Sequence, residues 1–191
     1  MKKLVIFDLD GTLLNTIADL AHSTNYALNK LGYPTHEIEK YNFMVGNGID
    51  KLFERALPEE EKSKENVLRV RKEFVPYYDI HNADDSRPYP GIPELLSYLQ
   101  DAGVQIAVAS NKYQTATQKL VDHYFPEIHF TAVFGQREGV KVKPDPIIVS
   151  DILEVAKVAK EEVLYVGDSG VDMQTAANAG VTACGVTWGF R

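Results

Sequence analysis

The stretch Leu4-Val5-Ile6-Phe7-Asp8-Leu9-Asp10-Gly11-Thr12 decides how this sequence is interpreted, because an apolar run leads directly into two acidic residues. Leu4 to Phe7 is short, continuous and apolar, which is typical of a strand in a parallel sheet that is covered on both faces. Asp8 and Asp10 are two residues apart, so an extended chain would point both carboxylates to the same side. This stretch therefore predicts an α/β fold with a polar site at the carboxyl end of its first strand.

The rest of the chain supports that fold. Other short apolar segments resemble the first strand, and helical patterns separate them from Gly91 onward. Alternation of strands and helices with short connections indicates right-handed βαβ units, and hence a Rossmann-like parallel sheet sandwiched by helices. The expected strands are residues 4–7, 105–109, 163–166, 181–186 and, more weakly, 130–134, and the expected helices are residues 93–102, 114–124, 146–156 and 171–179.

One long segment departs from the alternation. Residues 15–84 show helical periodicity and no convincing strand, and a turn-rich segment rich in Asp, Pro and Gly follows them. We expect residues 1–14 and 85–191 to form the core domain, with residues 15–84 inserted as a separate helical domain.

Composition narrows the possible partners. The 191 residues include 27 acidic and 20 basic side chains, a formal net charge of −7, which argues against binding to nucleic-acid phosphates. Asp8 and Asp10 interrupt the apolar start before a signal peptide could form, and no apolar stretch is long enough to span a membrane. A single cysteine, Cys184, cannot form an intramolecular disulfide, and we expect it to be packed inside the last strand. These features predict a cytoplasmic protein without nucleic-acid or membrane partners.

Acidic residues follow two of the predicted strands. Asp8 and Asp10 come after the first strand, and Asp168 comes after the strand at 163–166. A lone aspartate is more often a helix cap or a turn residue, but three at converging strand ends repel one another and are costly to desolvate. A hard divalent cation with oxygen ligands relieves this repulsion, so we predict a Mg²⁺ site at Asp8, Asp10 and Asp168.

Groups suited to an anion lie at the same predicted edge. Backbone N–H groups near Thr12 and around Ser110 and Asn111 could face a phosphoryl group, and Lys143 could supply a positive charge. The simpler alternatives are that Ser110 and Asn111 cap the next helix, and that Lys143 is a solvated surface lysine. Neither a P-loop nor a dinucleotide fingerprint is present, which excludes phosphate binding of those kinds.

These residues together resemble a known family. Asp8-Leu9-Asp10-Gly11-Thr12, Ser110-Asn111, Lys143-Pro144 and Gly167-Asp168-Ser169-Gly170-Val171-Asp172 are similar, in this order, to the four motifs of the haloacid dehalogenase (HAD) superfamily. The resemblance spans almost the whole chain. It implies that the helical insert is a type 1 cap, and that the protein uses Mg²⁺ to hydrolyse a small phosphorylated metabolite.

The resemblance also implies residue roles. Asp8 would be the nucleophile that forms an aspartyl-phosphate, and Asp10 would be the general acid and then the general base. Mg²⁺ would be held by the side chains of Asp8 and Asp168 and by the backbone carbonyl of Asp10. Ser110 and Lys143 would bind the phosphoryl oxygens with help from the backbone N–H of Asn111, and Asp172 would support Lys143 or a metal-bound water.

A narrower similarity points to a substrate. Val45-Gly46-Asn47-Gly48, with Arg55 downstream and Gly185-Val186-Thr187-Trp188-Gly189 near the end, resembles bacterial phosphoglycolate phosphatases. Thr12 is the residue that phosphatases of the superfamily usually carry, and Asp10 argues against dehalogenation. Asn47 is predicted to bind substrate and Arg55 could face the cleft, although a turn at Asn47 and a solvated Arg55 are the simpler alternatives.

The sequence therefore predicts a Mg²⁺-dependent phosphomonoesterase, acting on 2-phosphoglycolate through an aspartyl-phosphate, as a monomer or homodimer. One alternative is a HAD phosphatase for pyrophosphate or sugar phosphates. Another is a receiver-like phospho-aspartate signalling module, which also gathers acids, a hydroxyl residue and a lysine on a parallel sheet. The acidic pair on the first strand and the helical insert both disfavour the receiver.

Overall fold

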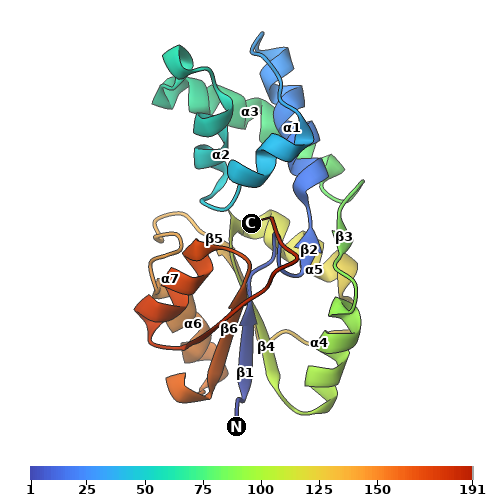
Figure 1. Cartoon of the computed structure of the whole chain (residues 1–191), viewed down its shortest axis with the longest axis vertical. Coiled ribbons are helices and arrows are strands. Elements are labelled where there is room, and N and C mark those ends of the chain that lie inside the picture. Colours follow the sequence, from blue (N-terminus) through green and yellow to red (C-terminus); the bar gives the residue numbers. More distant parts are fainter. Residues whose placement is uncertain (191) are drawn as a thin grey trace.

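The computed structural model describes residues 1–190 and contains a five-stranded, wholly parallel sheet with the strand order β5-β4-β1-β6-β7 (Figure 1). The first strand lies at its centre, with Leu4 opposite Gln105 of β4 on one side and opposite Val163 of β6 on the other. The strands are β1 (Leu4–Phe7), β4 (Gln105–Tyr113), β5 (Ala132–Gln136), β6 (Val163–Gly167) and β7 (Thr182–Gly185). The predicted parallel sheet is therefore confirmed.

Helices cover both faces of the sheet, and the alternation of side chains along β1 explains how. Leu4 and Ile6 pack into an apolar cluster with α6 (Ile147–Ala156) and α7 (Gly170–Ala179). Val5 and Phe7 point the other way, into a cluster with α4 (Ile92–Asp101) and α5 (Gln114–Tyr124). Because both sets are buried, the strand is apolar throughout rather than alternating between apolar and polar residues.

The helical insert (residues 17–81) stands above the carboxyl ends of the strands (Figure 1). It has its own apolar cluster, in which the largest buried side chains are Tyr41, Phe53, Phe74 and Tyr78. Its elements are α1 (Ile17–Lys30), η1 (Ile38–Phe43), α2 (Ile49–Ala56), η2 (Glu59–Glu61) and α3 (Lys64–His81).

The chain crosses between the sheet and the insert twice, and the two crossings are paired. β2 (Leu14–Asn15) and β3 (Arg87–Pro88) form a two-stranded antiparallel ribbon. Beside it, the buried carboxylate of Asp19 accepts hydrogen bonds from the backbone of Asp85 (2.9 Å) and from both the backbone (2.8 Å) and the hydroxyl (2.6 Å) of Ser86. These contacts hold the return crossing against the start of α1.

Two details differ from the sequence expectations. β4 continues through Ser110 and Asn111 to Tyr113, with an irregular register after Ala109, so these polar residues lie in the strand and not after it. Cys184 is exposed, and the expectation that it is packed inside is wrong, because all four residues of the edge strand β7 are exposed. Among the described residues, no helix has the length and apolar character needed to span a membrane.

Candidate active site

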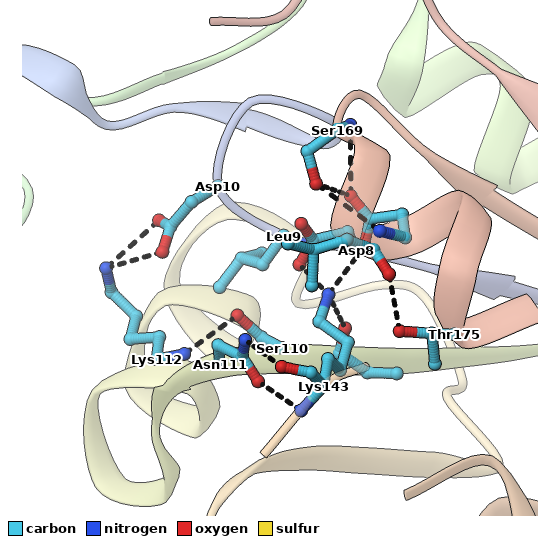
Figure 2. Close-up of polar contacts among 12 residues, drawn as sticks. Asp8, Leu9, Asp10, Ser110, Asn111, Lys112, Lys143, Ser169 and Thr175 are labelled. Carbon is cyan, nitrogen blue, oxygen red and sulfur yellow. Dashed lines mark hydrogen bonds and ion pairs between the residues drawn. The ribbon is translucent and has the colours of Figure 1, made fainter. Parts of the chain in front are cut away.

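Three strands deliver their carboxyl ends to one pocket. Asp8 and Asp10 follow β1, Ser110 and Asn111 come from β4, and Asp168 follows β6, and all five line the pocket. Figure 2 shows the polar contacts around Asp8, Asp10, Ser110 and Asn111. The opposite wall is formed by the insert, so the pocket lies between the sheet and the insert: Leu20, Asn42, Val45, Gly46, Gly48, Ile49 and Leu52 line it from that side.

A buried ion network forms the floor of the site. Lys143 Nζ lies 3.0 Å from Asp8 Oδ1 and 2.7 Å from Asp172 Oδ1, and it also donates to the Ala109 carbonyl at 2.9 Å. Lys143 is 2% exposed and Asp172 is fully buried. The alternative of a solvated surface lysine is therefore wrong, because the ammonium is enclosed by carboxylates and a backbone carbonyl.

The protein compensates the charges of Asp8, Asp172 and Lys143 to different extents. Burial, together with the nearby carboxylates of Asp172 and Asp168, raises the pKa of Asp8 well above its usual range, despite Lys143. Burial would raise the pKa of Asp172 too, but the Lys143 ammonium and the hydrogen bonds from Lys143 and Ser169 together outweigh it and lower that pKa. Burial alone would lower the pKa of Lys143, but Asp172 and Asp8 hold it well above its usual value. Negative charge at Asp8 is thus incompletely compensated by the protein.

The acids at the pocket fit a divalent cation. Asp8, Asp168 and Asp172 each offer a carboxylate oxygen within 4.8 Å of the others. Asp172 is already committed to Lys143 and to Ser169, whose hydroxyl donates to it at 2.6 Å in a capping box at the start of α7. Asp8 and Asp168 are therefore the side chains best placed to hold a metal ion, and burial raises the pKa of Asp168 as well. Oxygen-only ligands favour a hard cation.

Glycines let the backbone close around Asp168. A Cβ on Gly11 would lie 2.4 Å from Asp168 Oδ2, and a Cβ on Gly189 would lie 2.2 Å from Asp168 Cβ. Gly11 also has a φ of +87°, a left-handed backbone conformation that residues other than glycine rarely adopt. The backbone N–H of Phe190 donates to Asp168 Oδ2 at 2.9 Å, which brings Phe190 into the pocket wall.

Asn111 organises the loops rather than capping a helix. Its Oδ1 accepts from the Lys143 backbone N–H at 2.8 Å, and its Nδ2 donates to the carbonyls of Lys143 and Gly46, both at 3.1 Å. The N-cap of α5 is Tyr113, and it makes no side-chain capping bond. The alternative in which Ser110 and Asn111 cap the next helix is therefore wrong, because the strand continues past them. Ser110 Oγ accepts from the backbone N–H of Lys112 at 3.2 Å.

Asp10 has partners that the sequence analysis missed. Lys112 Nζ lies 3.0 Å from both carboxylate oxygens of Asp10, and the Thr16 hydroxyl donates to Asp10 Oδ1 at 2.6 Å. Lys112 immediately follows the predicted anion-binding pair Ser110-Asn111 and is buried. Its position next to that pair was the sequence signal that could have pointed to Lys112. A lysine that follows a strand is usually exposed to solvent, so this signal is weak.

Two predicted substrate-binding residues are not brought to the pocket with the others. Thr12 is fully buried, and its hydroxyl has no hydrogen-bond partner within residues 1–190. Its backbone N–H donates to the Leu9 carbonyl at 3.3 Å, and its carbonyl accepts from Trp188 Nε1 at 3.1 Å. Asn47 lies between two pocket-lining glycines, but its Oδ1 accepts from Arg55 at 2.8 Å. Arg55 also donates to the Met44 carbonyl at 2.7 Å, so it braces this turn of the insert instead of facing the pocket.

Known proteins share this arrangement. Residues 5–186 match the family model of the haloacid dehalogenase-like hydrolases. A phosphoglycolate phosphatase from Vibrio parahaemolyticus is 34% identical over 194 residues, covering 99% of this chain and 85% of that protein. A solved protein from Lactobacillus delbrueckii subsp. bulgaricus is 34% identical, with a TM-score of 0.93, 100% of this chain and 89% of that chain being covered. A predicted phosphoglycolate phosphatase from Haemophilus somnus, also solved, is 31% identical with a TM-score of 0.91, covering 98% and 86%.

The family match spans the sheet, the insert and every motif around the pocket. The matches indicate a phosphoric monoester hydrolase and leave no reason to prefer a receiver-like module. The chain therefore belongs to the haloacid dehalogenase-like hydrolase family, as a phosphoglycolate phosphatase-like member.

Proposed function

We propose that the chain is a Mg²⁺-dependent phosphomonoesterase that hydrolyses 2-phosphoglycolate through an aspartyl-phosphate on Asp8. The observation that carries this proposal is the position of the Asp8 carboxylate, which lines the pocket while Lys143 lies 3.0 Å behind it. A buried carboxylate with incompletely compensated charge, next to a cation that can also meet phosphoryl oxygens, is suited to in-line attack on phosphorus.

The first chemical step transfers the phosphoryl group. An Asp8 oxygen forms a bond to phosphorus while the bond from phosphorus to the ester oxygen breaks, and Asp10 donates its proton to the leaving alkoxide. In the second step Asp10, now a carboxylate, takes a proton from a water molecule that attacks the phosphorus. The bond from phosphorus to the Asp8 oxygen breaks, which releases inorganic phosphate and regenerates the Asp8 carboxylate.

The remaining residues bind and orient the phosphoryl group. Ser110 lines the pocket beside Asp8, where it can meet a phosphoryl oxygen. Lys143 is held behind Asp8 by Asp172, and its positive charge there favours the phosphoryl group. Asp8 and Asp168 would hold Mg²⁺ with their side chains, and Asp10 with its backbone carbonyl. When bound, this ion would polarise the phosphoryl group and balance negative charge.

The substrate follows from the enclosure and from the relatives. The insert closes the pocket with Leu20, Val45, Ile49 and Leu52, which favours a small substrate and excludes water from the reacting groups. We propose that residues 15–84 act as the cap over a core of residues 1–14 and 85–191. Relatives at 31–34% identity over nearly the whole chain carry the name phosphoglycolate phosphatase, and they supply the choice of 2-phosphoglycolate over other small esters.

A phosphate-release assay tests this function. We expect rapid release from 2-phosphoglycolate in the presence of Mg²⁺, and none above background after addition of EDTA. Pyrophosphate and sugar phosphates serve as competing substrates. Comparable values of kcat/KM for a sugar phosphate and 2-phosphoglycolate would overturn the substrate, and full activity in EDTA would overturn the metal requirement.

A further inference from the structure

Lys112 is a buried cation for which the proposed reaction supplies no role. Its side chain is 1% exposed, although it contributes to the pocket wall beside Asp10. The Asp10 carboxylate is held through both of its oxygens, each 3.0 Å from Lys112 Nζ, as Figure 2 shows. Holding a carboxylate at both oxygens fixes its rotation as well as its distance, which a single contact would not.

The same ammonium also reaches the insert. Lys112 Nζ lies 4.9 Å from the ring centroid of Tyr78, which is fully buried on α3. A cation over an aromatic face is attracted by the ring, and more strongly where water is excluded. Lys112 therefore contacts Asp10 of the core and Tyr78 of the insert at once.

Neighbouring residues fasten the same end of α3. The Tyr113 hydroxyl donates to Asp79 Oδ1 at 2.6 Å, and Lys119 Nζ donates to the Asp79 carbonyl. Tyr78 and Tyr113 also meet edge to face, with ring centroids 6.4 Å apart. The residues that follow Ser110 and Asn111, from Lys112 to Lys119, thus hold the C-terminal end of α3 against the core.

We propose that Lys112 is a positioning residue: it fixes the carboxylate of Asp10 and makes its orientation depend on the seating of Tyr78, and therefore of the insert. The proposal rests on the proposed function, in which Asp10 donates a proton to the leaving group. With Tyr78 in place, Lys112 has one enclosed position from which it reaches both Asp10 oxygens. When the insert moves away, that enclosure is lost and Asp10 is no longer held for proton transfer.

The role of Lys112 can be tested with substrates whose leaving groups differ in their need for a proton. Ethyl phosphate and 2-phosphoglycolate leave as alkoxides, which need a proton, whereas acetyl phosphate leaves as acetate, which needs none. In Lys112→Met we expect kcat/KM to fall by about 10-fold to 100-fold for both alkyl esters, as misplacement of a catalytic group does. The value for acetyl phosphate should fall far less. Because kcat/KM reports only the steps up to phosphoryl transfer, the later hydrolysis does not obscure the comparison.

The chain offers a matched lysine control. Lys119→Met removes another contact between the core and the same end of α3, but Lys119 is exposed and does not touch Asp10. The ratio of kcat/KM between ethyl phosphate and acetyl phosphate should stay at the wild-type value in Lys119→Met. Retained turnover of acetyl phosphate in Lys112→Met shows that this variant folds.

The contribution of the insert is tested at Tyr78. Tyr78→Phe keeps the ring under Lys112, whereas Tyr78→Leu keeps an apolar side chain without a π face. We expect Tyr78→Leu to lower the ratio for ethyl phosphate over acetyl phosphate relative to Tyr78→Phe. Equal ratios in the two variants would overturn the link to the insert.

The three substrates separate the other outcomes. A loss in Lys112→Met confined to 2-phosphoglycolate would mean that Lys112 binds the substrate carboxylate, and equal losses on all three would mean a structural role; either result overturns the positioning proposal. If the wild type cleaves ethyl and acetyl phosphate but not 2-phosphoglycolate, the proposed substrate fails, while the comparison of ethyl with acetyl phosphate still decides the role of Lys112.

Discussion

Asp8, the proposed nucleophile, opposes folding when it is ionised. Its pKa is raised by burial and by neighbouring carboxylates, so at neutral pH its ionised form is more stable in the unfolded chain than in the metal-free fold. Asp8→Asn removes that charge and keeps the side-chain volume. We expect it to abolish phosphate release, by at least about 1,000-fold as loss of a nucleophile does, while the melting temperature without metal stays equal or rises. Calorimetry at pH 7 with EDTA measures this, and a lower melting temperature would contradict it.

Lys143, unlike Asp8, stabilises the folded chain. It is buried between Asp8 and Asp172, and both carboxylates lose their partner if it is removed. Lys143→Met preserves most of the volume but leaves buried charge unpaired, which typically costs 3–5 kcal/mol. Urea unfolding should therefore show a free energy of unfolding lower by about that amount. Adding Asp172→Asn to Lys143→Met should recover part of the loss; an additive further loss would show that the pair is not coupled.

Individual residues also show what sequence reasoning can reach. Asp8, Asp10 and Asp168 were predictable because charges placed directly after strands of a parallel sheet must share one edge. Lys143 lies well beyond the end of β5 and was predicted from the positive charge that a phosphoryl group needs and from the family resemblance. Lys112 was not, since its burial depends on Tyr78, which is 34 residues away along the chain in the insert. Thr12 and Asn47 were predicted at the pocket, but side-chain direction in a turn cannot be deduced from residue type.

At the scale of elements, the insert carries tyrosines whose phenols are protected from water. Burial raises the pKa of Tyr41 and Tyr78 above the usual phenol value of about 10. Above that pH the unfolded chain releases these protons while the fold retains them, so stability falls as pH rises. Each such tyrosine contributes a slope of up to about 1.4 kcal/mol per pH unit.

Urea unfolding between pH 8 and pH 11 measures this slope. Tyr41→Phe should flatten it and, at pH 8, should lose the hydrogen bond from the Tyr41 hydroxyl to Asn25 Oδ1, which is 2.6 Å long. A wild-type free energy of unfolding that does not change across this range would contradict the expectation. Tyr98, which is 70% exposed, supplies the control, because Tyr98→Phe should leave the slope unchanged.

Longer helices and strands were predicted better from the sequence than short ones. The covering helices carry enough apolar residues for a helical period to show, and the strands of the parallel sheet are recognisable as short apolar runs. These elements were found, but β4 extends four residues beyond its expected end and β5 lies two residues later than expected. β2 and β3 have two residues each, too few for any period, and their pairing is set by the two chain crossings. The exposure of Cys184 was missed because an apolar sequence does not reveal whether a strand lies at the centre or the edge of its sheet.

At the scale of the whole molecule, metal binding should stabilise the fold. A ligand that binds only the folded chain adds about 2.7 kcal/mol to the free energy of unfolding at 100 times its Kd. We expect Mg²⁺ to raise the melting temperature of the wild type, and Asp168→Asn to remove most of that increase. Asp50→Asn is the matched control, because Asp50 is an exposed acid that is paired with Arg71 and is not among the residues that line the pocket. Equal increases in both variants would place the ion elsewhere.

The paired crossings determine how the molecule can move. β2 and β3 lie edge to edge, and Asp19 fastens the start of α1 to residues 85 and 86 of the returning chain. Two connections joined side by side resist twisting and sideways displacement, but they can still bend across their common plane. The insert should therefore bend most easily about a single axis, the one that crosses the plane of β2 and β3. We expect substrate entry to proceed by a tilt of the insert about that axis, with the same surfaces meeting again when it returns.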